Sequence, residues 1–249
     1  MSEPEASEPQ LAASRPEPPS ALRVLVTGGS KGIGRHTALA LARRGCHLVL
    51  VARSPERLAE VRQEILDSGA PAVYALRADL ADPKQAVGAW LRGWSLLGEI
   101  DVLINNAGFN PRRAPFETFS LDEWDSVLAV NLRAPFLLGQ QAVRDMRARG
   151  SGHILNVLST ASHHAIPYMA PYVAAKMGLL GMTRVLAMEA QRYGIRVSTV
   201  SPGATDSAED GVERCMRPAS VGEIIAAAAF TPPDIAVSEI IVRPTGLDG

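Results

Sequence analysis

The residues Thr27-Gly28-Gly29-Ser30-Lys31-Gly32-Ile33-Gly34 stand between an apolar run, 22–27, and a segment with helical apolar spacing, 34–44. The run predicts a buried strand, and the segment predicts an α-helix. Glycine lets the backbone between them turn tightly and approach an anion, toward which the first N–H groups of the helix point. The stretch therefore predicts a phosphate-binding turn, with the spacing G-x-x-x-G-x-G and not G-x-G-x-x-G. On this motif alone, a glycine-rich turn without a ligand is the alternative.

The same alternation of strand and helix continues along the chain. Further strands are expected at 47–52, 72–76, 102–104, 153–158, 195–200 and 238–242. Helices are expected at 55–67, 83–97, 121–132, 135–149, 168–193 and 220–230, with Pro135 as a break or kink between two of them. Such alternation implies right-handed crossovers and a parallel sheet. The expected fold class is therefore α/β, a single Rossmann-type doubly wound parallel sheet of about seven strands with helices on both faces.

The composition excludes several classes of partner. Of the 249 residues, 47% are apolar and 5% aromatic, and the formal net charge is −1. A near-neutral chain with few aromatic residues lacks the basic surface and the stacking platform of a nucleic-acid-binding protein. Apolar runs such as 224–230 have seven residues, whereas a membrane-spanning helix needs about 20. We therefore expect no nucleic-acid partner and no membrane segment.

The first 20 residues differ from the rest of the chain. They hold five of the 18 prolines and four glutamates against one arginine, a composition that buries too little apolar surface to become ordered. We expect a disordered leader at 1–20, with a partner-binding arm as the alternative, and a single Rossmann-type domain at 21–249. The leader lacks the basic start and apolar stretch of a signal peptide. Cys46 and Cys215 are too few for a disulfide framework, so reduced thiols and a cytoplasmic location are expected.

The end of the second predicted strand indicates which nucleotide the turn holds. A site for NAD usually places Asp or Glu there, bound to the ribose 2′-hydroxyl. This strand ends Leu50-Val51-Ala52-Arg53-Ser54, without an acid. Arg53 and Lys31 are cations suited to a 2′-phosphate, which a guanidinium binds with two hydrogen bonds. NADP(H) is therefore favoured over NAD(H), and a pair of solvated surface cations is the alternative.

Tyr172 and Lys176 lie four residues apart on one predicted helix, so their side chains share a face. A nearby ammonium favours the phenolate and lowers the pKa of a tyrosine, which otherwise titrates near ~10. Such a pair can act as general acid and base near neutral pH. Ser159 lies at the carboxyl end of the fifth predicted strand, the edge at which open parallel sheets bind ligands. Its hydroxyl can donate a hydrogen bond to a substrate oxygen as charge develops there.

Together these residues resemble the short-chain dehydrogenase/reductase family, of the type with the short core, over about residues 22–245. The resemblance rests on the T-G-x-x-x-G-x-G turn, on Asn105-Asn106-Ala107-Gly108, on the Y-x-x-x-K pair, and on their order along the chain. It implies hydride transfer between a nicotinamide and a carbonyl or alcohol carbon. The implied catalytic residues are Asn131, Ser159, Tyr172 and Lys176. The implied cofactor contacts are Thr27, Gly28, Ser30, Lys31, Gly32, Ile33, Gly34, Arg53, Asp79, Leu80, Asn106, Ala107, Gly108, Tyr172, Lys176, Pro202, Gly203 and Thr205.

The family implies a role for each catalytic residue. Tyr172 gives a proton to the ketone oxygen, Ser159 polarises and positions that oxygen, and Lys176 lowers the pKa of Tyr172 and binds the nicotinamide ribose. Asn131 holds a water that returns the proton. The resemblance also implies a homodimer or homotetramer packed through 135–149 and 168–193. The expected function is an NADP(H)-dependent oxidoreductase that interconverts a ketone and a secondary alcohol, and a catalytically silent NADP(H)-sensing protein is the alternative.

The motifs define the substrate side less closely. Candidate pocket residues are Phe109, Asn110, Ser159, His163, His164, Tyr168 and Met169. Two adjacent histidines without further ligand spacing do not indicate a metal, and none is expected. Arg112 and Arg113 can attract a carboxylate or a carrier phosphate, or lie on a solvated loop. Only about 15 residues separate Gly203 from the next helix, which predicts a short lid over the substrate.

The choice of substrate stays open at this level. The end of the chain resembles family members that act on small 3-hydroxy acids, because it lacks an aspartate-glycine-glycine ending. The middle of the chain is closer to 3-oxoacyl reductases and sugar-acid dehydrogenases. These two resemblances point to different substrates.

Overall fold

The computed structural model describes residues 21–206 and 215–245. Its strands are β1 (Arg23–Thr27), β2 (His47–Ala52), β3 (Val73–Arg77), β4 (Val102–Asn105), β5 (Gly152–Val157), β6 (Ile195–Pro202) and β7 (Glu239–Val242). Its α-helices are α1 (Gly32–Ala42), α2 (Pro55–Asp67), α3 (Pro83–Leu97), α4 (Leu121–Leu128), α5 (Ala134–Arg149), α6 (Ala170–Ala190) and α7 (Pro218–Ala229). The leader expected at 1–20 and residues 207–214 of the expected lid lie outside this range.

The strands form one parallel sheet in the spatial order β3-β2-β1-β4-β5-β6-β7. The chain moves outward from β1 to β3 and then returns to β4, which pairs with the other side of β1. This reversal separates the loops that follow β1 and β4, and such a switch point opens a crevice at the carboxyl ends of the strands. The doubly wound α/β fold expected from the sequence is therefore confirmed.

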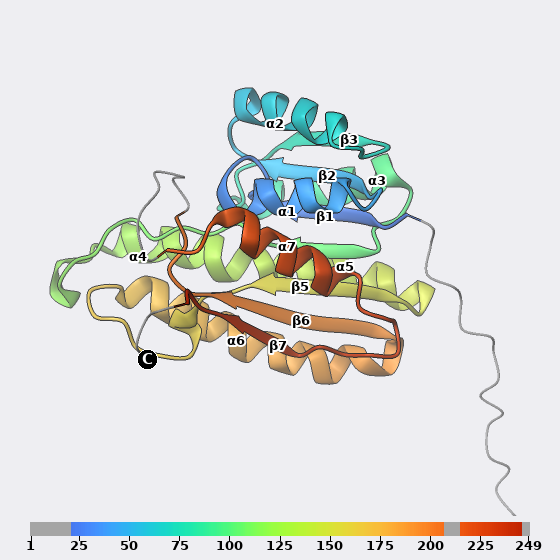
Figure 1. The fold of residues 1–249 in the computed structure, drawn as a ribbon. Coiled ribbons are helices and arrows are strands. Elements are labelled where there is room, and N and C mark those ends of the chain that lie inside the picture. Colours follow the sequence, from blue (N-terminus) through green and yellow to red (C-terminus); the bar gives the residue numbers. More distant parts are fainter. Residues whose placement is uncertain (1–20, 207–214, 246–249) are drawn as a thin grey trace, which may run out of the picture.

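Each face of the sheet has its own apolar core, because successive side chains of a strand point to opposite faces. Val24 and Val26 pack with residues of α1, α2 and α7. Leu25, between them, packs on the other face with Trp90 of α3 and Leu138 of α5. Figure 1 shows α1, α2 and α7 on the near face of the sheet. Within residues 21–206 and 215–245, no helix is both long enough and apolar enough to cross a membrane.

Several element boundaries follow from local capping. The strand 47–52 and the helices 55–67 and 83–97 have the bounds expected from the sequence. The Ser54 hydroxyl accepts a hydrogen bond from Arg57 N (3.3 Å), and Asp82 Oδ1 accepts one from Lys84 N (2.8 Å). Both helices then begin with a proline, which has no N–H to leave unpaired.

The first and last helices begin two residues earlier than expected, at Gly32 and Pro218, and two other helical segments differ further. The segment 121–149 is interrupted before Pro135 by a π turn, Ala129–Arg133, in which Ala134 N–H donates to the carbonyl five residues back. Pro135 then lies in the first turn of α5, where a missing N–H costs little. The last long helix begins at Ala170 and not at 168, because Tyr168 has a φ of +67°. It ends at Ala190, and a 3₁₀ turn, Gln191–Tyr193, follows.

A histidine inside the sheet makes folding sensitive to acid. His153 of β5 is buried, with Nε2 2.8 Å from the Ser198 hydroxyl. Burial, aided by the charge of Arg196, lowers the pKa of His153 to about 3. In the unfolded chain its pKa returns to about 6.5. The unfolded state therefore binds the extra proton between these values, and the stability due to neutral His153 is lost as pH falls below about 6.5.

We expect the free energy of unfolding to decrease by roughly 1 kcal/mol per pH unit between about pH 6 and pH 4 because of His153. His153→Gln should flatten this decrease, whatever its stability at neutral pH. The measurement is urea unfolding of both proteins across this pH range. His47→Gln, which changes a half-buried histidine at the start of β2, is the control and should keep the wild-type slope. Equal slopes in the wild type and His153→Gln would contradict the assignment.

Candidate active site

A cavity of about 910 Å³ lies at the carboxyl ends of the strands. Segments that follow β1, β2, β3, β4, β5 and β6 contribute to its wall, together with the first turns of α1 and α6. The residues proposed from the sequence that line it are Gly28, Ser30, Lys31, Gly32, Ile33, Gly34, Arg53, Asp79, Leu80, Asn106, Ala107, Gly108, Phe109, Asn110, Ser159, Met169, Tyr172, Lys176, Pro202, Gly203 and Thr205. The structure therefore brings most of the proposed site residues together around one cavity.

Two proposed residues, Thr27 and Asn131, lie behind the wall, and three lie away from it. His163 Nε2 is 3.0 Å from the Ser201 hydroxyl, and His164 Nε2 is 3.0 Å from the Arg243 guanidinium. Tyr168 is 60% exposed. None of His163, His164 and Tyr168 belongs to the described lining of the cavity. Of the segment between Ser159 and Tyr172, the apolar residues that line the cavity are instead Ile166 and Met169.

Sequence reasoning missed Arg57, which lines the cavity beside Arg53. Ser54 caps α2, so Arg57 lies in the first turn of that helix, next to the end of β2. The sequence could have indicated Arg57. A serine that caps a helix accepts a hydrogen bond from the residue three positions later, and so holds that residue close to the end of the preceding strand. Thr160, Ile166 and Ala204 also line the cavity and carried no motif.

The glycine-rich turn forms a close-fitting corner between β1 and β4. Gly28, with φ of +67°, donates its N–H to the Val51 carbonyl at 2.7 Å. A Cβ on Gly34 would overlap the Gly28 carbonyl oxygen and Asn106 Nδ2. The N-cap of α1 is Lys31, whose side chain makes no capping hydrogen bond. The first N–H groups of α1 therefore remain available at the cavity, which suits the phosphates of a dinucleotide.

Charges on the cavity wall are mostly positive. Lys31, Arg53 and Arg57 lie at the β1 and β2 side, where a 2′-phosphate would sit. The one acid in the described lining is Asp79, whose Oδ1 accepts a hydrogen bond from Ala81 N at 3.0 Å. The wall therefore suits an anionic ligand. In the same described ranges, no three His, Cys, Asp or Glu side chains gather as metal ligands would.

Tyr172, Lys176 and Ser159 meet on one side of the cavity. Ser159 follows β5, and its hydroxyl acts to lower the pKa of Tyr172. Lys176 lies one turn further along α6, with Nζ 5.8 Å from the centre of the Tyr172 ring. Its ammonium donates to the Val157 carbonyl at 2.9 Å. An ammonium has three N–H donors, so this arrangement leaves donors for a ligand in the cavity.

Burial governs the protonation of this group. Lys176 is only 3% exposed, and burial lowers its pKa to about 8. Burial also raises the pKa of Tyr172 above its usual value, while the hydrogen bond from Ser159 acts in the opposite direction. The sequence predicted a lowered tyrosine pKa. In the ligand-free protein desolvation outweighs that effect, so Tyr172 holds its proton at neutral pH.

Asn131 projects from the π turn toward the same group. Its Nδ2 donates to the carbonyls of Phe109 (2.9 Å) and Val127 (3.0 Å). Its Oδ1 is buried and has no hydrogen-bond partner among the described residues. A Cβ on Gly108 would lie 2.6 Å from this oxygen and 3.4 Å from Lys176 Nζ. The oxygen and the ammonium therefore face the same point above Gly108.

The chain is similar to known proteins along most of its length. A family described as short chain dehydrogenase matches residues 23–215. The chain is 38% identical to levodione reductase of Leifsonia aquatica over 182 residues, 73% of this chain and 68% of that protein. It is 38% identical to gluconate 5-dehydrogenase of Gluconobacter oxydans over 192 residues, 76% of this chain and 74% of that protein. A metagenomic short-chain oxidoreductase solved in complex with NADP has a TM-score of 0.82 and 34% identity, over 91% of this chain and 98% of that chain.

The close packing around Gly34 predicts that a side chain at this position destabilises the fold. Because a Cβ there would meet backbone, Gly34→Ala should lower the free energy of unfolding by about 1–3 kcal/mol. Gly88→Ala in α3 is the matched control, because a Cβ at Gly88 meets nothing within 4 Å. It should leave stability unchanged or raise it by roughly 0.5–1 kcal/mol. The measurement is urea unfolding, and equal effects of the two substitutions would contradict the close approach.

Proposed function

The chain belongs to the short-chain dehydrogenase/reductase family, and on that premise we propose that it is an NADP(H)-dependent oxidoreductase interconverting a ketone and a secondary alcohol. The observation that carries the proposal is that Ser159, Tyr172 and Lys176, the last one helical turn from the tyrosine, line the same cavity as the glycine-rich turn. A proton donor and a dinucleotide corner thus share one space. The catalytic domain in this proposal runs from residue 21 to residue 249.

The cavity suits NADP(H) better than NAD(H). The two residues directly after β2 are Arg53 and Ser54 and not an acid, and Lys31, Arg53 and Arg57 supply three cations where the adenine ribose would lie. A guanidinium can bind a phosphate through two parallel hydrogen bonds. The related metagenomic oxidoreductase was solved with NADP, which supports the same choice here. Asp79 and Leu80, which follow β3, would contact the adenine.

When bound, NADPH supplies a hydride to the ketone carbon, and NADP⁺ accepts one from the alcohol carbon in the reverse direction. Tyr172 donates its proton to the ketone oxygen, so that the ketone, the hydride and this proton together make the alcohol. Ser159 donates a hydrogen bond to the same oxygen and fixes its position. The raised pKa of Tyr172 in the free protein keeps the phenol protonated, which is the form that reduction requires.

Lys176 and Asn131 complete the proton-transfer group. Loss of the proton from Tyr172 leaves a phenolate, which the nearby Lys176 ammonium stabilises. The remaining N–H donors of Lys176 suit the hydroxyls of the nicotinamide ribose. Asn131 Oδ1 lies beside this ammonium, where it can hold a water that returns a proton to Tyr172. Pro202, Gly203 and Thr205 line the same part of the cavity and would contact the nicotinamide.

The substrate would lie against Ser159, Phe109 and Met169, which line the cavity on the tyrosine side. Relatives named levodione reductase and gluconate 5-dehydrogenase indicate a small-molecule carbonyl or alcohol. A reducing compartment such as the cytoplasm suits the free thiols of Cys46 and Cys215.

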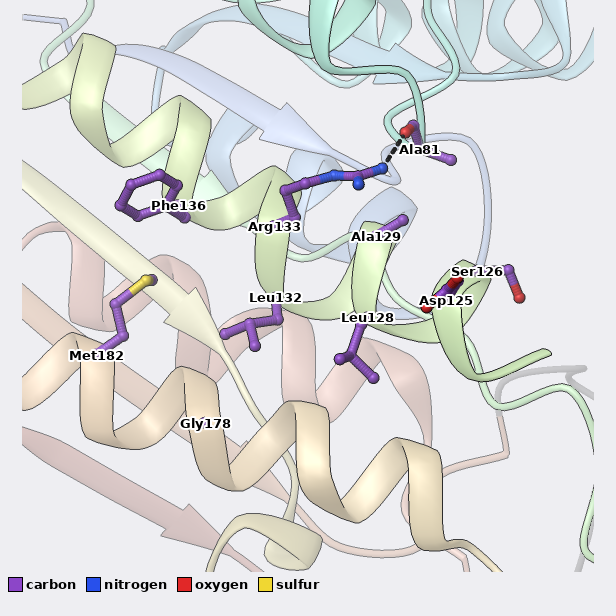
Figure 2. A pocket seen from close by; sticks show the side chains of 10 residues that line it. All are labelled: Ala81, Asp125, Ser126, Leu128, Ala129, Leu132, Arg133, Phe136, Gly178 and Met182. Carbon is purple, nitrogen blue, oxygen red and sulfur yellow. Dashed lines mark hydrogen bonds between the residues drawn. The ribbon is translucent and has the colours of Figure 1, made fainter. Parts of the chain in front are cut away.

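Self-association is part of the proposal. A groove of about 900 Å³ runs between α6 and the helices around the π turn, and Figure 2 shows Leu132, Phe136 and Met182 along it. Phe136 is 45% exposed, and Met188 on α6 is 80% exposed. A second copy of the chain, in a homodimer or homotetramer, would cover these apolar side chains.

Removal of the Tyr172 hydroxyl tests the reaction. Tyr172→Phe should reduce turnover by about 10²–10⁴-fold, because the proton donor is lost. NADPH binding, followed by fluorescence, should change by less than about twofold. Tyr193→Phe, outside the cavity wall, is the control and should keep activity. A wild-type protein that binds NADPH but turns over no 2-oxo, 3-oxo or cyclic ketone would instead favour the cofactor-sensing alternative.

Removal of the Arg53 charge tests the cofactor. Arg53→Ala should weaken NADP⁺ binding by about 10–100-fold, because a charge-assisted hydrogen bond to phosphate is lost, and should leave NAD⁺ binding nearly unchanged. Arg77→Ala is the control, because Arg77 is exposed at the end of β3 and does not line the cavity. Calorimetric titration gives the four dissociation constants. Tighter binding of NAD⁺ than of NADP⁺ by the wild type would contradict the choice of cofactor.

A further inference from the structure

The loop between β4 and α4 carries a cation that the proposed reaction does not use. Arg113 lines the cavity, and no ion pair or hydrogen bond joins it to another described residue. It is therefore distinct from Lys31, Arg53 and Arg57, which lie on the β1 and β2 side, and from Lys176, which is buried beside Tyr172. A cation on a cavity wall without a partner in the protein is available to a ligand.

The neighbouring Arg112, in contrast, has its partners within the protein. Arg112 donates two hydrogen bonds to the Glu123 carboxylate, at 2.5 and 3.0 Å, and a third to the Thr118 carbonyl at 2.7 Å. Its guanidinium also lies 5.0 Å from the centre of the Phe119 ring. Arg112 therefore fixes the loop to the start of α4, while the next residue faces the cavity.

Arg113 is anchored on its other side as well. The Ala114 N–H donates to the Tyr168 carbonyl at 3.0 Å, and Ala114 is buried. This bond joins the β4–α4 loop to the segment that leads into α6, directly beside Met169 of the cavity wall. The backbone of Arg113 is thus fixed on both sides, at the part of the cavity that carries Tyr172, while its side chain is exposed. A fixed backbone leaves less of the loop to be ordered when this side chain binds a ligand.

The composition of this wall favours an anion. Besides Lys176 and Arg113, the described lining on the tyrosine side contains no charged residue, because the single acid, Asp79, follows β3 at the far end. Asn110, three residues before Arg113, has a buried Oδ1 without a partner among the residues described. The wall therefore combines one unpaired cation with one open acceptor, which suits a ligand that has both an anionic group and a hydroxyl.

We propose that the substrate is a hydroxy acid and its oxo acid, and that Arg113 binds the substrate carboxylate while Tyr172 and Ser159 hold the reacting oxygen. This inference rests on the proposed function and adds the class of substrate to it. A planar guanidinium matches a carboxylate through two parallel hydrogen bonds. One unpaired arginine balances one negative charge, so a monoanion is a better fit than a phosphate ester. Arg113 is then a specificity-determining residue.

The test compares short 2-oxo and 3-oxo acids with their own methyl esters as substrates for NADPH oxidation, because each pair differs mainly in charge. The wild type should prefer the acid. Arg113→Gln should lower kcat/KM for the acid by about 10–100-fold, mainly through KM, and should change that for the ester by less than about twofold. Arg113→Lys should recover part of the loss. Arg92→Gln, which removes an exposed charge on α3 away from the cavity, should have no effect.

A binding measurement keeps the test independent of turnover. Butyrate and butyramide are titrated calorimetrically into the complex of the protein with NADP⁺. Butyrate should bind to the wild type more tightly than butyramide, and Arg113→Gln should remove this difference. An unchanged acid-to-ester ratio in Arg113→Gln, or equal binding of butyrate and butyramide by the wild type, would overturn the inference while leaving the proposed function intact. Bound NADPH without turnover of any acid, ester or cyclic ketone would overturn the proposed function itself.

Discussion

The hydrogen bonds between Thr27 and Asn106 hold together the two strands at which the sheet reverses its order. Asn106 Nδ2 donates to the Thr27 carbonyl (2.9 Å), and the Thr27 hydroxyl accepts from the backbone N–H groups of Asn106 and Ala107 (3.0 Å each). The glycine-rich turn packs against these hydrogen bonds, because Gly34 lies against Asn106 Nδ2. The β4–α4 loop leaves from the same place. Both halves of the cavity therefore meet at these hydrogen bonds, which extend the pairing of β1 and β4 beyond the strands themselves.

The site is built at some cost to stability. A lysine is held almost without exposure, an asparagine oxygen is buried without a partner in the described structure, and a π turn interrupts a long helix. Each of these features is unfavourable when considered alone. All three converge on the space above Gly108, beside Tyr172. Such a concentration of unfavourable features is expected where a protein is selected to bind and transform a ligand and not only to fold.

Local signals explain which parts of the fold the sequence predicts well. The bounds of α2 and α3 follow from a capping Ser54 or Asp82 and a proline in the first helical turn, all within a few residues. The alternation of strands and helices determines the parallel sheet in the same way. The motifs also place the glycine turn, Ser159, Tyr172 and Lys176 around one cavity.

The features that the sequence does not reveal depend on distant contacts. Asn131 in the π turn bonds to the carbonyl of Phe109, 22 positions away, and the positive φ of Tyr168 accompanies its bond to Ala114. The orientation of His163 and His164 away from the cavity likewise depends on Ser201 and Arg243. No short-range pattern reports such partners. The raised pKa of Tyr172 belongs to the same group, because burial is a property of the whole fold.

The bond between Ala114 and Tyr168 has a consequence for how such a protein can diverge. It joins two backbones, so it does not depend on the side chains of the exposed residues next to it, such as Arg113. The two loops that border the substrate side can therefore accumulate substitutions while their mutual position is kept. The dinucleotide corner lies on other segments and is unaffected by those changes. Evolution can thus exchange one substrate for another on this scaffold by small steps, without rebuilding the half of the cavity to which we assign the cofactor.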